Sequence, residues 1–358
     1  MSEKIQRLQN AMREAELDGL LLTRRDNIAW LTEGATFYVV DRAETGVASL
    51  LITHQGVTLI APDNELPRIL AEETLPFPLR TVSYPWFTEF NKVLTSLPLS
   101  RLGSDTQLPE TVNCEAQLIA MRSGLNPAER ERFFELGQQV ATLVEKVARR
   151  VRRGMTERQV EAEIYAECLP SGIRPLCTLV AADQRITDYK HPIPGATAVQ
   201  QKMLITLGAE RHGLNVSLSR MVHLGEPSAA DRHKLQAVAE IHADMLAASL
   251  PDRRWQDIFG DIQASYARQG YADAWQTHHQ GGPAGYGCRD FIVAAETSGL
   301  LAVNQALAWN PTLPGVKSEE TAMVTEEGLR FLTRTDDWPV ITLQRGNSVW
   351  TFADWLVI

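Results

Sequence analysis

The chain has 358 residues, 44% of them hydrophobic and 22% charged. At ~150 residues per domain, this length predicts about two domains with sizeable cores and excludes disorder as the dominant state. The 44 acidic residues outnumber the 35 basic ones, which gives a formal net charge of -9. This balance argues against a nucleic-acid partner, which needs a basic face, and favours neutral or cationic small ligands.

The cysteines lie far apart in the sequence and form no CxxC or CxC pair, which excludes a zinc ribbon and a disulfide scaffold. They are Cys114, Cys168, Cys177 and Cys288. We therefore expect reduced, mostly buried thiols. The first residues lack the apolar core of a signal peptide, and no apolar run approaches the ~20 residues of a membrane helix. We expect a cytoplasmic protein with no membrane partner.

The first third of the chain alternates helix-like and strand-like segments. Apolar residues at helical spacing mark one face of an opening helix: Ile5, Leu8, Met12 and Leu17. Short apolar runs predict strands at 20–22, 47–52, 57–60 and 81–84. Residues 63–73 fit a further helix. This alternation predicts a layered α/β domain over residues 1–123.

A second domain, residues 124–358, begins with a capped helix. Asn126 is a good N-cap, Pro127 fits the first helical position and Glu129 completes a capping box. The apolar residues that follow step by three or four, which predicts a long amphipathic helix. We interpret the basic cluster at 149–153 as a solvated helix end, favoured by the helix dipole and closed by a glycine, rather than as an anion site.

The second domain repeats one pattern of elements, two helices followed by three strands. In the first copy the strands are predicted near 176–182, 202–208 and 214–223, after a helix capped by Thr156. In the second copy the helices are predicted over 229–249 and 255–270, and the strands near 290–295, 305–309 and 319–325. Two such units packed side by side would form a cleft at their pseudo-symmetry axis. We therefore expect a duplicated α+β domain.

A histidine that precedes a Pro-x-Pro turn, His191, lies on a loop whose backbone is restrained. Histidine is the natural proton shuttle near neutral pH, so His191 is a candidate acid or base. The alternative is a loop histidine bonded to the backbone.

Two adjacent histidines, His278 and His279, come just before a glycine-rich turn that lets a ligand approach the backbone closely. Adjacent side chains on a strand point to opposite faces, so we expect at most one of the two to face a site. They lack a nearby partner carboxylate that would complete a metal site, and a packing turn is the alternative.

Two adjacent carboxylates, Glu319 and Glu320, begin a segment that otherwise reads as an apolar strand, where an unpaired carboxylate is costly to bury. Because strand residues alternate faces, one is expected to face inward and the other outward. Surface salt bridges are the alternative. The segment 206–220 reads as two strands with a tight connection, and taken alone it is structural.

In this order, these clusters resemble the "pita-bread" M24 family, which includes methionine aminopeptidase, Xaa-Pro aminopeptidase, prolidase and creatinase. The resemblance covers nearly the whole chain. Its opening, including residues 27–32, looks like a creatinase-type N-terminal domain, residues 154–157 match a step early in the catalytic domain, and residues 325–328 look like its closing strand. The resemblance implies an α+β pita-bread domain behind an α/β N-terminal domain. It also implies a homodimer.

Active members of that family hold two metal ions with two Asp, one His and two Glu. The resemblance places these ligands, in that order, on Thr206, Ser217, Gly282, Asn310 and Glu319, so only the last one is retained. A further family histidine is replaced by Arg289. Two divalent ions need several anionic or imidazole donors, which one carboxylate does not supply. We therefore expect no bound metal, no other cofactor and no metal-generated hydroxide.

The resemblance still implies a reaction, because creatinase cleaves a C–N bond on this fold without metal, using a histidine and carboxylates. By that likeness His191 would move a proton between the attacking water and the leaving nitrogen, which is typically worth ~10²–10⁴-fold. Glu319 would orient water or bind a cationic nitrogen group. A carboxylate or oxyanion would be held by His278 or His279 and Arg220, and a carbonyl by Asn310. Tyr189 and Glu320 complete the expected substrate site.

Three hypotheses remain open at this point. A metal-independent hydrolase of a small C–N compound or short Xaa-Pro-like peptide would use His191 and Glu319. An Xaa-Pro-type metalloaminopeptidase with a displaced or single metal site would use His278, His279 and Glu319. A non-catalytic module would bind a peptide or partner in the cleft.

Overall fold

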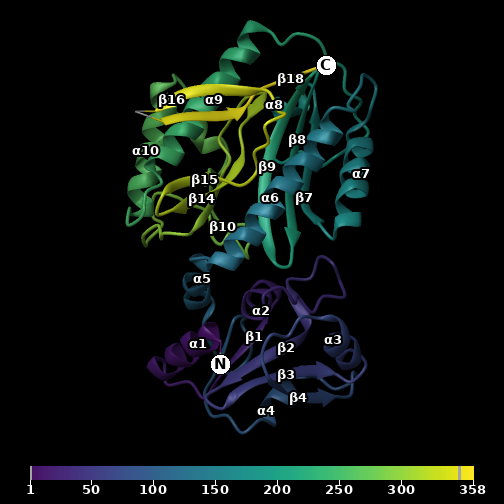
Figure 1. Cartoon of the computed structure of the whole chain (residues 1–358), viewed down its shortest axis with the longest axis vertical. Helices are drawn as coiled ribbons and strands as arrows, with labels where there is room; N and C mark the ends of the chain where they lie inside the picture. Colours follow the sequence, from purple (N-terminus) through teal and green to yellow (C-terminus); the bar gives the residue numbers. More distant parts are fainter. Residues whose placement is uncertain (1, 346–347) are drawn as a thin grey trace. The chain divides into compact units, whose positions relative to one another are not determined.

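The computed structural model describes residues 2–345 and 348–358, and it divides the chain into two compact units (Figure 1). One unit consists of the residues up to Arg122 together with His212–Leu214, and the other of Ser123–Arg211 with Asn215–Ile358. Within the described residues, we find no helix long and apolar enough to cross a membrane.

The first unit is built on a mixed sheet with the strand order β4-β3-β2-β1-β5-β6. Its strands are β1 (Gly19–Arg24), β2 (Thr45–Thr53), β3 (Gly56–Pro62), β4 (Leu79–Tyr84), β5 (Leu102–Ser104) and β6 (Thr111–Asn113). Strand β2 pairs antiparallel with both β1 and β3, and the other pairs are parallel. The helices up to residue 123 are α1 (Glu3–Glu14), α2 (Arg25–Thr32), α3 (Leu66–Glu72), α4 (Phe90–Thr95) and α5 (Glu115–Ser123). The expected layered α/β domain is confirmed.

The apolar run of β1 explains its central place in this sheet. Leu20, Leu21 and Leu22 are all at most 3% exposed, so both faces of the strand are covered. A strand covered on both faces has a continuous apolar run instead of an alternating one. The expected helix at 63–73 is shorter, Leu66–Glu72, with a proline in its first turn.

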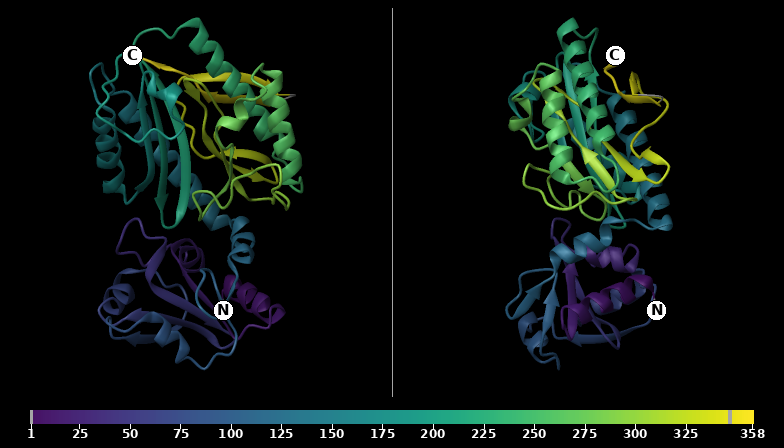
Figure 2. Two further views of the ribbon diagram at one scale, coloured as in Figure 1. Left: turned by 180° about the vertical axis from the view of Figure 1, so that it is seen from behind. Right: turned by 90° about the vertical axis from the view of Figure 1, so that its left-hand side faces the viewer.

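The second unit contains two four-stranded sheets (Figures 1 and 2). The first has the order β18-β9-β8-β7 and consists of β7 (Arg174–Ala182), β8 (Lys202–Arg211), β9 (Leu214–His223) and β18 (Leu356–Val357). The second has the order β10-β11-β14-β15 and consists of β10 (Gly281–Ala284), β11 (Ala306–Trp309), β14 (Glu320–Thr325) and β15 (Gly328–Phe331). Two smaller ribbons are β12 (Thr312–Leu313) with β13 (Val316–Lys317), and β16 (Val340–Arg345) with β17 (Ser348–Ala353).

A pair of helices belongs to each of these sheets. Helices α6 (Pro127–Ala148) and α7 (Glu157–Cys168) pack on β8 and β7, and α9 (Ala229–Ala248) with α10 (Trp255–Arg268) accompanies the second sheet (Figure 1). Short turns of helix are η1 (Leu169–Ser171), α8 (Arg185–Asp188) and η2 (Ala274–Thr277). Helix α6 has the expected capping box of Asn126 and Glu129, and Thr156 with Gln159 forms another at α7.

The repeated pattern of two helices and three strands is confirmed, with one error in the second copy. Residues 290–295 form a loop and not a strand. Two isolated hydrogen bonds hold this loop against β10: the Asp290 amide donates to Pro283 at 2.9 Å and the Val293 amide donates to Gly281 at 3.0 Å. Of the apolar residues in this loop Val293 is buried, at 1% exposed, whereas Ile292 is 40% exposed. The strand expected at 290–295 is instead β10, earlier in the chain, in the segment that the sequence indicated as a glycine-rich turn.

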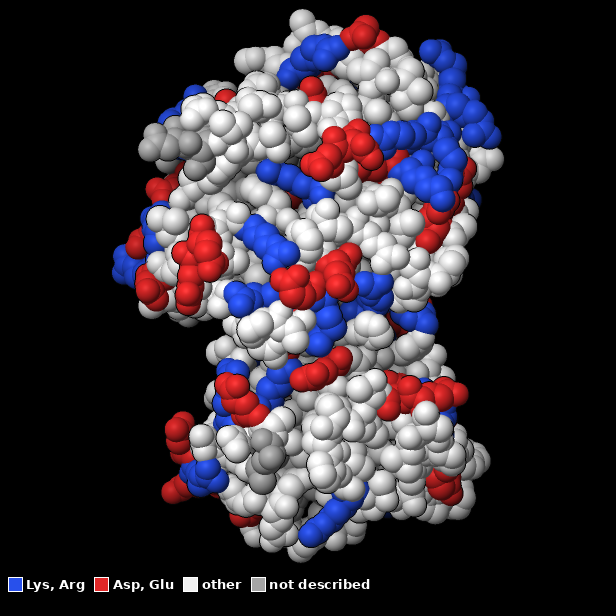
Figure 3. All heavy atoms as spheres, viewed as in Figure 1, with Lys and Arg blue, Asp and Glu red and all other residues white. Residues whose placement is uncertain are grey.

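The charges of the molecule are mixed in space as well as in number. On the face drawn in Figure 3, Lys and Arg side chains lie among Asp and Glu side chains in both units. On this face neither kind of charge is confined to one of the two units.

Candidate functional site

The two sheets of the second unit are joined where β9 meets the segment leading into β14. The Ser219 amide donates to the Glu319 carbonyl at 3.0 Å, and the Thr321 hydroxyl bridges the Ser217 amide and carbonyl at 2.8 and 2.9 Å. Because strand residues alternate faces, Ser217 and Ser219 share one face and Arg220 lies on the other. The position of Glu319 is therefore fixed by a backbone hydrogen bond from Ser219 and, two residues further on, by the side-chain contacts of Thr321 with Ser217.

Both oxygens of the Glu319 carboxylate are engaged by other side chains. Oε1 accepts from Arg289 Nη2 at 2.9 Å, whereas Oε2 accepts from Ser219 Oγ at 2.8 Å and lies 3.1 Å from Lys317 Nζ. Burial alone raises the pKa of Glu319, but Lys317, Arg289 and Ser219 outweigh burial and hold this pKa at about 2. Glu319 is thus ionised and unable to serve as a proton acceptor near neutral pH.

The hydroxyls around Glu319 belong to the same network. Thr206 Oγ1 lies 2.6 Å from Ser219 Oγ, and Arg289 donates through Nη1 to Ser217 Oγ at 3.1 Å and to the Cys288 carbonyl at 2.6 Å. Thr206 and Ser217 are each 4% exposed. Positions that the resemblance associates with aspartate ligands are therefore held by hydroxyl contacts, one of them with a guanidinium group.

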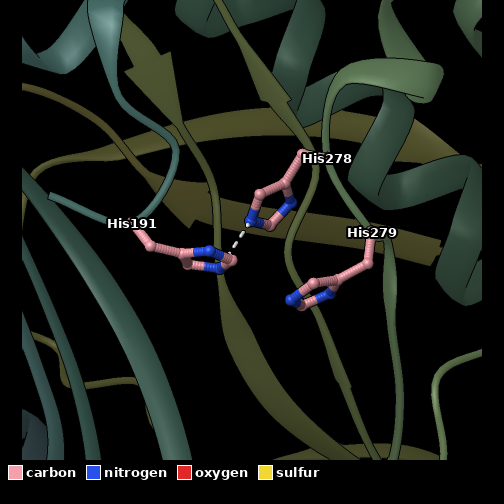
Figure 4. Close-up of side chains that lie close together, drawn as sticks. All are labelled: His191, His278 and His279. Atoms are coloured by element: carbon pink, nitrogen blue, oxygen red, sulfur yellow. Dashed lines mark hydrogen bonds between the residues drawn. The ribbon is translucent and has the colours of Figure 1, made fainter.

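A cluster of three imidazoles lies in the same unit (Figure 4). His191 stands on the loop after α8, and His278 and His279 lie between η2 and β10. His191 Nε2 and His278 Nε2 are 3.2 Å apart, and the ring centroids of His278 and His279 are 4.4 Å apart. The expectation that at most one of the adjacent histidines faces a site is wrong, because both precede the strand and are not subject to its alternation.

The three imidazoles are kept neutral by their surroundings. Burial and the charge of Lys317 lower the pKa of His278 to about 3, and burial and the charge of Arg289 lower the pKa of His279 to about 4. Burial and Lys317 also lower the pKa of His191, with Glu319 acting in the opposite direction. Because Lys317 and Glu319 influence all three rings, the histidines and the Glu319 network form one electrostatic site.

Two of the expected substrate-binding residues lie elsewhere, in a buried ion network. Arg220 donates to Glu145 at 2.9 Å, to Glu320 at 2.8 Å and to the Thr333 carbonyl at 2.7 Å. Arg220 and Glu320 are each 1% exposed. The structure therefore does not bring Arg220 or Glu320 to the histidines. Each follows directly after a residue of the Glu319 network, Ser219 or Glu319, and adjacent residues of a strand point to opposite faces.

The remaining expected residues have a mixed outcome. Asn310 is 3% exposed, and its Oδ1 has no hydrogen-bond partner among the described residues. Tyr189, two residues before His191, is half exposed and stacks on Arg185 at 5.0 Å. Asn310 thus offers a buried polar atom without a protein partner, whereas the contacts of Tyr189 are with Arg185.

Sequence reasoning missed the two cations that engage Glu319. Lys317 stands two residues before Glu319, so an extended backbone places both side chains on one side, and this signal was available in the sequence. Arg289 was noted only as the replacement of a histidine. The contact of Arg289 with Glu319 depends on the course of the loop after β10, and no local pattern in the sequence predicts it.

Comparisons with known proteins identify both parts of the chain. Residues 131–326 match metallopeptidase family M24, and residues 4–121 match the creatinase/prolidase N-terminal domain. The chain is 19% identical to an Xaa-Pro dipeptidase of Pyrococcus horikoshii, covering 94% of this chain and 98% of that protein. It is 21% identical to the uncharacterized peptidase YqhT of Bacillus subtilis, covering 93% and 98%.

Solved structures show the same fold. The prolidase from Pyrococcus horikoshii has a TM-score of 0.79 at 19% identity and covers 94% of this chain and 99% of its own. The N-terminal domain of FACT complex subunit SPT16 from chickpea has a TM-score of 0.68 at 9% identity and covers 92% and 94%. The expected pita-bread fold with its N-terminal domain is confirmed.

The residues present do not fit the pair of metal ions that the family resemblance implies. Of the five ligand positions only Glu319 carries a carboxylate, and Arg289 and Lys317 already neutralise it. A Cβ built on Gly282 would lie 2.4 Å from the Phe291 carbonyl oxygen, so the backbone has no room for a histidine there. The Glu319 carboxylate already has three partners from the chain itself, which are Arg289, Lys317 and Ser219.

Proposed function

The chain belongs to metallopeptidase family M24, and we propose that it hydrolyses a C–N bond without a metal ion, with His191 as the general acid and base. The substrate we propose is a short peptide, such as an Xaa-Pro dipeptide, or another small nitrogen compound. One observation carries this proposal: the only ligand-type carboxylate among those five positions, Glu319, is paired with Arg289 and Lys317.

Fixed cations in a site from which water is largely excluded stabilise charge that develops on a substrate oxygen. Lys317 and Arg289 are held in place by Glu319, and Lys317 is 6% exposed. In this proposal one of them donates to the oxygen of the C–N substrate as the tetrahedral intermediate forms. Glu319 is then a positioning residue for the two cations. The sequence suggested that Glu319 binds a cationic nitrogen group of the substrate, but in this proposal Lys317 and Arg289 take that place beside its carboxylate.

His191 has the properties of a general base. Its lowered pKa leaves it neutral near pH 7. Its side chain is exposed, whereas that of His278, with which it shares the Nε2–Nε2 hydrogen bond, is buried. The proposed step moves a proton from the attacking water to His191 as the C–O bond forms, and then from His191 to the leaving nitrogen as the C–N bond breaks. This use of an imidazole typically contributes ~10²–10⁴-fold.

The test is turnover by protein purified without a chelator. We expect hydrolysis of at least one member of a panel of Xaa-Pro dipeptides and small amidino and ureido compounds, and EDTA should not lower it. His191→Gln should lower kcat by ~10²–10⁴-fold, whereas the exposed His233→Gln on α9 should not. Chelator-sensitive turnover restored by Mn²⁺ or Zn²⁺ would contradict the proposal, as would full activity in His191→Gln.

A binding module is the second candidate, and the saturation of Glu319 favours it, since no carboxylate at this point is left free to act as a base. The same fold occurs in a subunit of the FACT complex. A panel compound that raises the melting temperature by mass action but is not hydrolysed would favour this candidate. For either candidate we also propose a homodimer, as the family resemblance implies, and a cytoplasmic location, as the sequence predicts.

A further inference from the structure

We propose that the imidazoles of His191, His278 and His279 form a site for one borderline transition-metal ion of the Zn²⁺ or Co²⁺ type. This site is distinct from the carboxylate positions of the family, because none of the five positions contributes to it. The ring nitrogens converge from two separate segments, the loop after α8 and the stretch between η2 and β10 (Figure 4).

The spacing of the nitrogens supports a tetrahedral ion. Zn–N bonds of 2.0–2.1 Å at tetrahedral angles separate two ligand nitrogens by about 3.3 Å. His191 Nε2 and His278 Nε2 are 3.2 Å apart, and one nitrogen from each of the three rings lies within 4.8 Å of the other two. His279 therefore needs to close by at most about 1.5 Å, which side-chain rotation provides.

Unused ring nitrogens are a second observation. Nδ1 of His278 and Nδ1 of His279 are buried and have no hydrogen-bond partner among the described residues. His278 is 8% exposed, and a polar atom buried that deeply without a partner is costly. Because neither Nδ1 is held by a hydrogen bond to a described residue, no such bond opposes the rotation that His279 needs to reach an ion. The ion would replace the contact in which His191 and His278 share one proton.

The charges nearby define the kind of ion and limit its affinity. Three neutral imidazoles suit Zn²⁺, Co²⁺, Ni²⁺ and Cu²⁺, whereas Mg²⁺ and Ca²⁺ need oxygen ligands. Lys317 and Arg289 repel a cation, and Glu319 offsets one of these two charges. We therefore expect binding weaker than at an uncharged three-histidine site, and strengthened when Lys317 is removed.

A bound ion would occupy the lone pair of His191 and so inhibit the hydrolysis proposed above. This consequence rests on the proposed function, whereas the binding of the ion does not. The open fourth position of a three-histidine site would be filled by water.

The experiment is a Co²⁺ titration of the full chain, followed by visible absorption and by competition with Zn²⁺. We expect one equivalent to give the intense bands of tetrahedral Co²⁺, Zn²⁺ to displace it and Mg²⁺ to leave it unchanged. His279→Asn and His191→Asn should each weaken binding by at least ~10–100-fold, the loss typical of altering even an outer partner of a metal. The matched control His233→Asn should bind normally, and Lys317→Met should bind more tightly.

Weak octahedral spectra, binding that survives both ligand variants, or equal loss in His233→Asn would overturn the site. Circular dichroism confirms that each variant is folded, and if His279→Asn is not, His191→Asn on its exposed loop decides alone. Co²⁺ binding without turnover of any substrate would support the metal site and contradict the proposed function. Chelator-insensitive turnover without Co²⁺ binding would support the proposed function and contradict the metal site.

Discussion

The Nζ atom of Lys317 lies 3.1 Å from Oε2 of Glu319, and the two side chains are only 5% and 4% exposed. A buried carboxylate needs compensation, and in this member of a metallopeptidase family a lysine and an arginine provide it. The two cations beside Glu319 thus supply the positive charge that a buried carboxylate needs.

Removing Lys317 should destabilise the fold far more than removing an exposed lysine. Lys317→Met leaves Glu319 buried with Arg289 and Ser219 as its remaining partners, and we expect a loss of about 3 kcal/mol in the free energy of unfolding. Lys92→Met is the matched control, since its pair with Glu89 has the same 3.1 Å distance but is 72% and 74% exposed. That control should cost ~1 kcal/mol or less. Urea unfolding of both variants measures the difference, and equal losses would contradict the compensating role of Lys317.

The glycine at 282 should tolerate no side chain. A Cβ there would lie 2.4 Å from the Phe291 carbonyl oxygen, so Gly282→Ala should lower the free energy of unfolding by ~1–3 kcal/mol through overpacking. At Gly285 a Cβ would meet nothing within 4 Å, and Gly285→Ala should be neutral or slightly stabilising. Thermal unfolding compares the two. A destabilised Gly285→Ala beside an unaffected Gly282→Ala would mean that this loop has a different course.

Stability should fall as the pH drops below neutral. Burial and the charge of Arg334 lower the pKa of His242 to about 3, whereas in the unfolded chain it titrates near 6.5. Between these values the unfolded state binds the proton and the folded state does not, so stability is complete above about pH 6.5 and is lost as the pH decreases. At pH 5 this one group costs about 2 kcal/mol relative to pH 7. His278 and His279 act in the same direction.

The variant His242→Gln tests this assignment. Its ring Nδ1 lies 2.8 Å from Ser318 Oγ, a contact that an amide can replace. We expect a shallower decline of the unfolding free energy between pH 7 and pH 5 than in the unaltered chain. An identical decline in both proteins would show that His242 is not the group that takes up the proton.

Arg220 should prove structural. Arg220→Met leaves Glu145 and Glu320 buried without their cation, and we expect a loss of ~3–5 kcal/mol in the free energy of unfolding. Arg254→Met, whose 2.9 Å pair with Asp257 is exposed, should cost ~1 kcal/mol or less. If Arg220 bound substrate instead, the variant would unfold normally and show a raised KM.

Local patterns in the sequence predicted the elements and part of the site. Capping residues and apolar spacing located α6 and α7, and the loop preceding a Pro-x-Pro turn singled out His191. Alternation also predicted that Glu319 and Glu320 would point to opposite sides of the strand, and their different partners agree with this. The expectation that one of them faces outward is wrong, because both are buried, at 4% and 1% exposed, each in its own ion network.

What the sequence did not reveal depends on contacts between distant segments. Arg289 reaches Glu319 across 30 residues, and His191 meets His278 across 87. The prediction that His278 and His279 point to opposite faces assumed that both lie on a strand, but the strand begins only at Gly281. The close approach of the Phe291 carbonyl leaves no room for a side chain at Gly282, and no local pattern predicts that approach.

The most direct test is a crystal structure of the full chain soaked with Mn²⁺ and measured at an anomalous wavelength, since Mn²⁺ prefers oxygen ligands. We predict no manganese beside Thr206, Ser217 or Glu319, with Arg289 and Lys317 in contact with the Glu319 carboxylate. Two manganese ions bound at Glu319, with both cations displaced from it, would contradict the account.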